Sequence, residues 1–276
     1  MTKLTRLFPY VMLILLAGIL SFAQESKVDR ATVPFSDPSR PGLVKVGVYK
    51  GAVTVKGYNG KEVVVEARVR GKMISEKREV TGKAKGMKLI QVATTGLEIE
   101  EENNVIEIDV ESQRQAVDLT IQVPYATSLE IGGYTDGDII VENIKGEIEV
   151  GKYKGELKLS AISGSAVAHT YSGSIVVTFT NVDPGKPMSF TNYSGDIDVT
   201  FPADIKATVK MKSNQGDIYS DFDISIKPSP QKVEKPREKE GKYRVSFDYF
   251  YGTINGGGPE YHFKTYNGDV FIRKAK

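Results

Sequence analysis

The chain has 276 residues, with 37 basic and 35 acidic side chains, two histidines and no cysteine. This balance lacks the strongly basic footprint of a nucleic-acid-binding protein. Without cysteine the chain has no thiol nucleophile and no disulfide, and two histidines do not suffice for a zinc site of the usual kind. Packed apolar faces and strand hydrogen bonds must therefore stabilise the fold.

Residues 1–23 have the organisation of a cleaved export signal. Lys3 and Arg6 form a basic start, an apolar run follows from Phe8 to Leu20, and Ser21-Phe22-Ala23 has the small-x-small pattern of a cleavage point. The apolar run is short for a membrane span, which needs about 20 residues. Cleavage after Ala23 removes two of the 37 basic residues and no acidic residue, leaving 35 of each sign. We expect a protein exported to the periplasm, the cell surface or the medium, with no membrane span after cleavage.

The next segments predict a lead-in and then β-strands. Residues 24–42 carry three prolines among polar residues, which predicts an extended, flexible lead-in. From Leu43 onward apolar and polar residues alternate in valine-rich runs, a pattern typical of strands. Residues 71–88 break this pattern with charges and glycines and predict an inserted loop or a short helix. Alternation resumes over 97–110 and again over Asp118–Pro124, where proline ends the strand.

A nine-residue glycine repeat dominates the middle of the chain. Each repeat glycine is followed by an apolar residue two and four positions later, at Gly137, Gly146, Gly155, Gly164 and Gly173. The same phrase recurs at wider spacing, in part or in full, after Gly51, Gly195, Gly216 and Gly268. A fixed period indicates a stacked repeat architecture, and glycine permits the backbone angles of a tight corner.

The spacing of alternate glycines predicts coils of about eighteen to twenty-two residues with two short strands in each. The fold class is therefore all-β, a single β-solenoid or β-helix-like stack over residues 43–276. An antiparallel β-sandwich is the alternative, because short strands at regular spacing also describe it. The charged, proline-containing residues 227–242 predict a second inserted loop, one that protrudes. Tyr243–Ile254 and Tyr261–Ile272 predict a final hairpin about Gly256–Gly258, which caps one end of the stack as the lead-in caps the other.

Few residues indicate catalytic or metal chemistry. His169 and His262 are interpreted as plain histidines, and no nucleophile-elbow pattern is present, so we expect no enzyme and no cofactor. Aspartates that directly follow repeat glycines raise the hypothesis of a calcium-stabilised solenoid. The simpler interpretation is that these side chains cap the corners by hydrogen bonding to backbone. The residues concerned are Asp138, Asp196, Asp217 and Asp269.

Tyrosines recur two residues before repeat glycines, at Tyr49, Tyr153, Tyr171, Tyr193 and Tyr266. Stacked coils would align them as a ladder. Such a ladder can bind glycans or peptides, since tyrosine offers a large amphipathic contact, or it can simply cover the end of the core. Both interpretations stay open, and the candidate binding residues are Tyr153, Tyr171, Tyr193 and Tyr266.

Three phrases carry a family resemblance: Tyr-Ser-Gly-Ser-Ile-Val-Val at 171–177, Tyr-Ser-Gly-Asp-Ile-Asp-Val at 193–199 and Tyr-Asn-Gly-Asp-Val-Phe-Ile at 266–272. With the strand before them and the export signal, they resemble the bacterial putative-adhesin, β-strand-repeat family of unknown function (domain of unknown function 4097). The resemblance covers residues 43–276. It implies a β-solenoid-like fold and an exported location, and it supplies no catalytic residue.

Two functions follow as hypotheses from the repeat, the export signal and the resemblance. The first is an exported, non-enzymatic scaffold for adhesion or interaction, in the bacterial cell envelope or outside it, whose partner is an envelope protein or a cell-surface glycan. The second is a periplasmic accessory or sensing protein that binds another envelope protein. Neither hypothesis involves nucleic acid.

Overall fold

The computed structural model describes residues 28–70, 95–110, 112, 115–135, 137–227, 232–234, 244–246 and 249–276. These residues form strands and no helix, which confirms the all-β prediction, and so none of them lies in a helix that could cross a membrane. The export signal, the loop predicted over 71–88 and most of the loop predicted over 227–242 lie outside the described residues. In the second loop, β18 (Lys232–Glu234) pairs with β19 (Arg244–Ser246), which follows the predicted loop.

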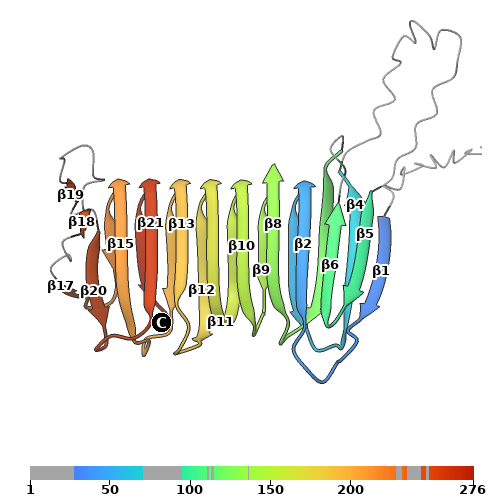
Figure 1. Cartoon of the computed structure of the whole chain (residues 1–276), viewed down its shortest axis with the longest axis horizontal. Helices are drawn as coiled ribbons and strands as arrows, with labels where there is room; N and C mark the ends of the chain where they lie inside the picture. The colour runs from blue at the N-terminus through green and yellow to red at the C-terminus, as the bar shows by residue number, and fades with distance from the viewer. Residues whose placement is uncertain are drawn as a thin grey trace, which may run out of the picture.

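Two sheets run the length of the molecule, with their strands lying across its long axis (Figure 1). Sheet A has the order β1 (Val28–Pro34), β4 (Glu62–Val69), β7 (Val117–Pro124), β3 (Val53–Tyr58), β9 (Ile139–Glu142), β11 (Leu157–Ser172), β12 (Ile175–Val182), β14 (Ile197–Phe201), β22 (Val270–Lys274), β16 (Ile218–Ser220). Sheet B has the order β5 (Leu97–Glu102), β6 (Val105–Val110), β2 (Leu43–Lys50), β8 (Ser128–Thr135), β10 (Glu147–Lys154), β11, β13 (Met188–Ser194), β21 (Glu260–Asn267), β15 (Ala207–Gln215), β20 (Phe250–Ile254), β17 (Ser225–Lys227). The long strand β11 passes from sheet A into sheet B.

Neighbouring strands in the centre of both sheets are parallel. In sheet B, Ile148 pairs with Ala166, and Ala168 pairs with Phe190, so each partner lies one coil, 18 or 22 residues, further along the chain. Sheet A repeats these steps between β9 and β11 and between β12 and β14. The antiparallel pairs of the two sheets lie at the ends, between β1, β4 and β7, between β5 and β6, and between β15, β20 and β17. The antiparallel sandwich therefore does not describe the centre of the molecule.

The core lies between the sheets because alternate residues of each strand point inward. Its N-terminal two-thirds are mainly valine, isoleucine and leucine. The C-terminal third instead contains a buried aromatic cluster whose rings contact one another from several strands. Its members are Phe179, Phe190, Phe201, Tyr261 and Phe263.

The strand order departs from the chain order at both ends. β2 and β3 lie between the strands of residues 105–124 and those of residues 128–142. Similarly, β21 lies between β13 and β15 (Figure 1). In sheet A, β22 lies between β14 and β16. The predicted hairpin of Tyr243–Ile254 with Tyr261–Ile272 is therefore wrong, because β15 separates β20 from β21. An inserted pair of strands finds partners on both edges, whereas a terminal hairpin would leave one edge open.

The lead-in predicted over 24–42 contains a strand among its described residues. Val28–Pro34 form β1, which pairs antiparallel with β4 at the end of sheet A. Without β1 the edge of β4 would be unpaired, and this edge position explains why a segment with half-exposed side chains is ordered.

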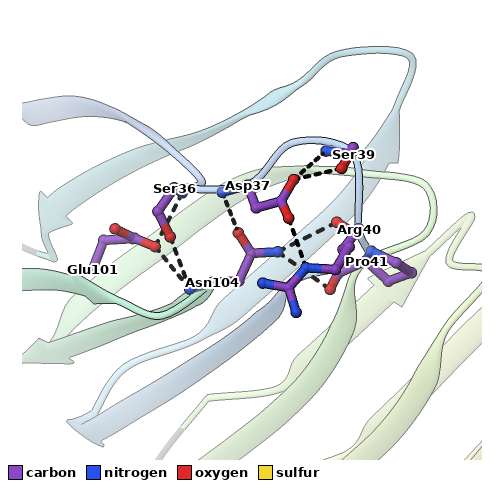
Figure 2. Close-up of polar contacts among 7 residues, drawn as sticks. All are labelled: Ser36, Asp37, Ser39, Arg40, Pro41, Glu101 and Asn104. Carbon is purple, nitrogen blue, oxygen red and sulfur yellow. Dashed lines mark hydrogen bonds and ion pairs between the residues drawn. The ribbon is translucent and has the colours of Figure 1, made fainter.

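Residues 36–41, after β1, are held to the turn between β5 and β6 by a polar network (Figure 2). The Asn104 side chain accepts a hydrogen bond from the Asp37 amide (2.7 Å) and donates to the carbonyls of Arg40 and Pro41. The Glu101 carboxylate accepts from the amides of Ser36 (3.1 Å) and Asn104 (3.0 Å). Buried Asn104 therefore connects residues 36–41 to the β5–β6 turn at this end of the stack.

The geometry predicts that acid loosens this end. Hydrogen bonds from the side chain and then the amide of Ser36 lower the pKa of Glu101 below its ordinary value of 4.5. A lowered pKa in the folded state stabilises the fold above the unfolded pKa, and this contribution is lost as the pH falls through the folded pKa. Protection of the Ser36 and Asn104 amides against exchange, measured relative to their intrinsic exchange rates, should fall below about pH 4.5. In the Glu101→Gln variant, the same two amides should exchange rapidly at neutral pH as well. Equal protection of these amides in the variant and the unchanged protein at pH 7 would contradict this role of Glu101.

Candidate binding surface on sheet B

Glycine corners position the tyrosines. Gly155, Gly173 and Gly195 have φ values of 129°, 139° and 124°, which L side chains rarely adopt. A Cβ atom on Gly173 would also collide with the carbonyl oxygen of Gly155 in the neighbouring coil. The corners therefore stack glycine on glycine, and the residues two positions earlier come into register.

Six tyrosines form one continuous ladder on the outer face of sheet B. The ring centroid of Tyr171 lies 4.9 Å from that of Tyr153 and 4.8 Å from that of Tyr193, with interplanar angles of 5° and 1°. The other centroid distances lie between 4.8 and 5.6 Å. The order along the ladder is Tyr49, Tyr134, Tyr153, Tyr171, Tyr193, Tyr266.

The structure brings together all four candidate residues, Tyr153, Tyr171, Tyr193 and Tyr266, and adds Tyr134, which the spacing rule missed. Tyr134 precedes its corner glycine by three residues instead of two. Counting from the start of the strand would have found it. Leu129 and Ile148 are paired in neighbouring strands, and each is followed five residues later by a ladder tyrosine, Tyr134 or Tyr153.

Stacking limits how the ladder can contact a ligand. Interior rings cover one another's faces, so they present edges and hydroxyl groups to the solvent. Between 40% and 55% of each tyrosine remains exposed. Ring-on-ring contact with a ligand is therefore blocked along the middle of the ladder, while hydrogen bonding to the hydroxyl row is open.

A groove runs beside the ladder over the same strands. The residues two positions before each tyrosine face the same side of the sheet, and in the first coils they are Gly47, Gly132 and Gly151. Further along, this row continues with His169, Thr191 and Lys264. Cavities of 720 and 820 Å³ follow the row, and both border on Gly132 and Tyr134. The floor of the groove is open backbone at Gly132, whereas the side chains of Asp109 and His169 lie over Gly47 and Gly151.

A buried polar row lies directly beneath the corner glycines. The Asn192 amide donates to the carbonyls of Gly173 (3.2 Å) and Gly195 (2.8 Å). Thr265 also donates to the Gly195 carbonyl. These bonds satisfy corner carbonyls that would otherwise be buried unpaired, so this row is structural and holds the ladder from below.

The corner aspartates form a ladder of their own. The Asp196 carboxylate accepts the amide of Asp269 (2.9 Å), and the Asp269 carboxylate accepts the amide of Asp217 (2.8 Å). Asp138 accepts the amide of Glu156 in the same way. This is the geometry of the capping interpretation. Within the described ranges, the histidines and carboxylates form no group of three or more that could hold a metal ion.

The two histidines lie in different surroundings on sheet B. His169 is exposed and leans over Gly151 in the groove. His262 is half-buried beside the Tyr249 ring, with 5.7 Å between centroids, and its Nε2 atom is buried without a hydrogen-bond partner among the described residues. Burial, and next the nearby Lys210 charge, lower the pKa of His262. His169 therefore belongs to the candidate surface, and His262 packs beneath a tyrosine.

The sequence profile of the Toastrack DUF4097 family matches residues 90–272, which is most of the chain. The chain belongs to this family. The Toastrack match includes the ladder tyrosines from Tyr134 to Tyr266, and it agrees with the resemblance inferred from the repeat phrases. Comparison with curated proteins gives no match.

Several solved structures are similar to this Toastrack chain. A "putative cell adhesion protein" from Clostridium sporogenes is 11% identical with a TM-score of 0.47, and the alignment covers 91% of this chain and 100% of that one. A "putative adhesin" from Bacteroides fragilis is 7% identical with a TM-score of 0.31, covering 90% and 97%. A "putative lipid binding protein" from Parabacteroides distasonis is 12% identical with a TM-score of 0.28, covering 91% and 98%.

Proposed function

We propose that this Toastrack chain is an exported, non-enzymatic scaffold for adhesion or interaction, acting in the bacterial cell envelope or outside it. The scaffold is a β-solenoid in which each central coil holds two strands, one in sheet A and one in sheet B. Its contact surface is the outer face of sheet B, along the tyrosine ladder.

The continuous ladder is the observation that carries this proposal. Six exposed rings form a row whose positions are set by backbone pairing. Because these side chains are already ordered, they lose little conformational entropy when a partner binds. Ordinary surface positions of a solenoid need no such row, and tyrosine is enriched at interfaces. The shallow groove beside the ladder leaves room for an extended partner.

Protease accessibility tests where the scaffold acts. A tagged protein that is cleaved in intact cells, or recovered from the medium, supports adhesion outside the cell. Protection until the envelope is opened supports the second hypothesis, a periplasmic protein that binds another envelope protein. Retention in the cytoplasm of intact cells would contradict both.

Loss of one ladder ring should weaken binding more than it weakens the fold. Tyr171→Ser should lower the free energy of unfolding by about 1 kcal/mol, the scale of a stacked aromatic pair. Binding of the labelled protein to isolated envelopes should fall several-fold. The matched control is Tyr219→Ser on sheet A, since Tyr219 is equally exposed (49% against 48%) and stacks on Phe271. Equal binding by both variants would contradict the ladder as the contact surface.

A further inference from the structure

The groove beside the ladder is rich in hydrogen-bond donors. The described residues that line the 820 Å³ cavity include Lys264, His169, Thr191, Asn214 and five of the six ladder tyrosines, and no aspartate or glutamate is among them. The chain as a whole carries 35 acidic residues, so a cavity of this length without one is a local departure from the overall charge. Tyrosine, threonine and asparagine groups can each donate to an acceptor on a ligand.

Charge along the outer face of sheet B changes from one end to the other. Near the N-terminal coils, Asp109 lies over Gly47, and Lys45 is shared between Glu107 and Glu130 at 3.6 and 3.7 Å. Near the C-terminal coils Lys264 is exposed and forms no ion pair with any other described residue. An anionic group is therefore favoured at the Lys264 end of the groove and disfavoured at the Asp109 end.

We propose that this groove binds an acidic polysaccharide that lies along the long axis, with carboxylate or sulfate groups over Thr191 and Lys264 and uncharged ring surface over Gly132. The proposal rests on the proposed function, because it names the ligand of the same surface. The open backbone at Gly132 lets a flat chain approach closely there. The tyrosine hydroxyls offer one donor or acceptor for every strand crossed.

The strand spacing favours a glycan over an extended peptide. Neighbouring strands lie about 4.8 Å apart, whereas an extended peptide advances about 3.3 Å per residue, so its groups would fall out of step with the tyrosine row. A sugar unit in an extended chain advances by close to the strand spacing and carries several hydroxyl groups. Hydroxyls can pair with both the donating and the accepting edge of the tyrosine row.

Calorimetric titration of the full chain with a galacturonate decamer tests the proposal. Lys264→Ala should weaken binding about tenfold, because it removes a charge-assisted hydrogen bond. Binding should also fall as salt rises from about 0.05 to about 0.5 M, through screening of that charge pair. The control is Lys158→Ala, which removes an exposed lysine from sheet A and should leave the affinity unchanged. Equal affinities of both variants would overturn the proposal.

A second variant tests the floor without changing charge. A Cβ atom at Gly132 would meet nothing closer than 4.0 Å, so Gly132→Phe should fold normally and yet fill the groove. We expect it to abolish binding of the decamer and of its neutral methyl ester, whereas Lys264→Ala should affect the acid form alone. Decamer binding that survives Gly132→Phe would place the ligand elsewhere and overturn the proposal.

The remaining outcomes separate this inference from the proposed function. Tight binding of a glutamate decapeptide but not of the galacturonate decamer would assign the groove to an acidic protein partner and reject the glycan. If neither probe binds, while Tyr171→Ser still lowers binding to envelopes several-fold, the ligand class is wrong and the scaffold function stands. If Tyr171→Ser has no effect either, both fail.

Discussion

Gly173→Ala should cost about 3 kcal/mol or more of unfolding free energy, combining backbone strain with a collision between coils. At φ 139° an L side chain is strained whatever the space around it. The new Cβ would in addition overlap the Gly155 carbonyl, which is backbone and is paired to its own neighbours. For a chain of this size the loss corresponds to about 6–12 °C in Tm. Urea unfolding followed by circular dichroism measures it.

Gly185→Ala is the matched control, because Gly185 lies in an exposed turn without a left-handed φ, and a Cβ there meets nothing closer than 3.6 Å. Its effect should stay within about 0.5 kcal/mol. The corner variant should also disturb the near-ultraviolet signal of the tyrosines, since Tyr171 and Tyr153 are placed by this corner. If the two variants were equally stable, corner stacking would not determine the fold.

The corners and the ladder were predictable because both depend on local spacing. A glycine that must take a left-handed angle leaves a mark at every coil, and the tyrosine two residues earlier inherits its position. Tyr134 escaped because its corner holds one more residue. The half-buried state of His262 escaped for a different reason. The Tyr249 ring packs against His262, and Tyr249 lies outside the repeat, so no spacing predicts this contact.

The order of the coils was not predictable, and the repeat itself is the reason. The phrases after Gly51 and Gly268 offer the same glycine and apolar slots as those of the central coils, so the phrases alone do not distinguish one coil from another. The connecting segments contribute to the order. Gly256 and Gly257, at φ 88° and 91°, turn the chain after β20 and allow residues 260–274 to return past β15. Periodicity determines which surfaces match, but not which matching surfaces meet.

Deleting residues 259–276 should therefore abolish cooperative folding. Four apolar or aromatic side chains of this segment are at most 1% exposed, namely Tyr261, Phe263, Val270 and Ile272. At about 1.5–3 kcal/mol for each buried side chain, their loss removes about 6–12 kcal/mol, which approaches the total stability of a typical domain. The deletion also leaves β13, β14, β15 and β16 with unpaired edges inside the stack. Circular dichroism during urea titration reports the result.

Removal of the other terminal strand supplies the contrast. A chain that begins at Phe35 lacks β1, which pairs along one edge with β4 alone and has no fully buried side chain. It should still unfold cooperatively, at a moderately lower urea concentration, because only an edge is lost. A synthetic peptide of residues 259–276 should bind the C-terminally truncated chain and restore the strand signal. The truncation leaves a gap with strands on both sides, and the peptide can pair with the strands on both edges of this gap. A cooperative transition of the C-terminal truncation near that of the full chain would mean that β21 and β22 form an outer cap after all, and the inserted position would be wrong.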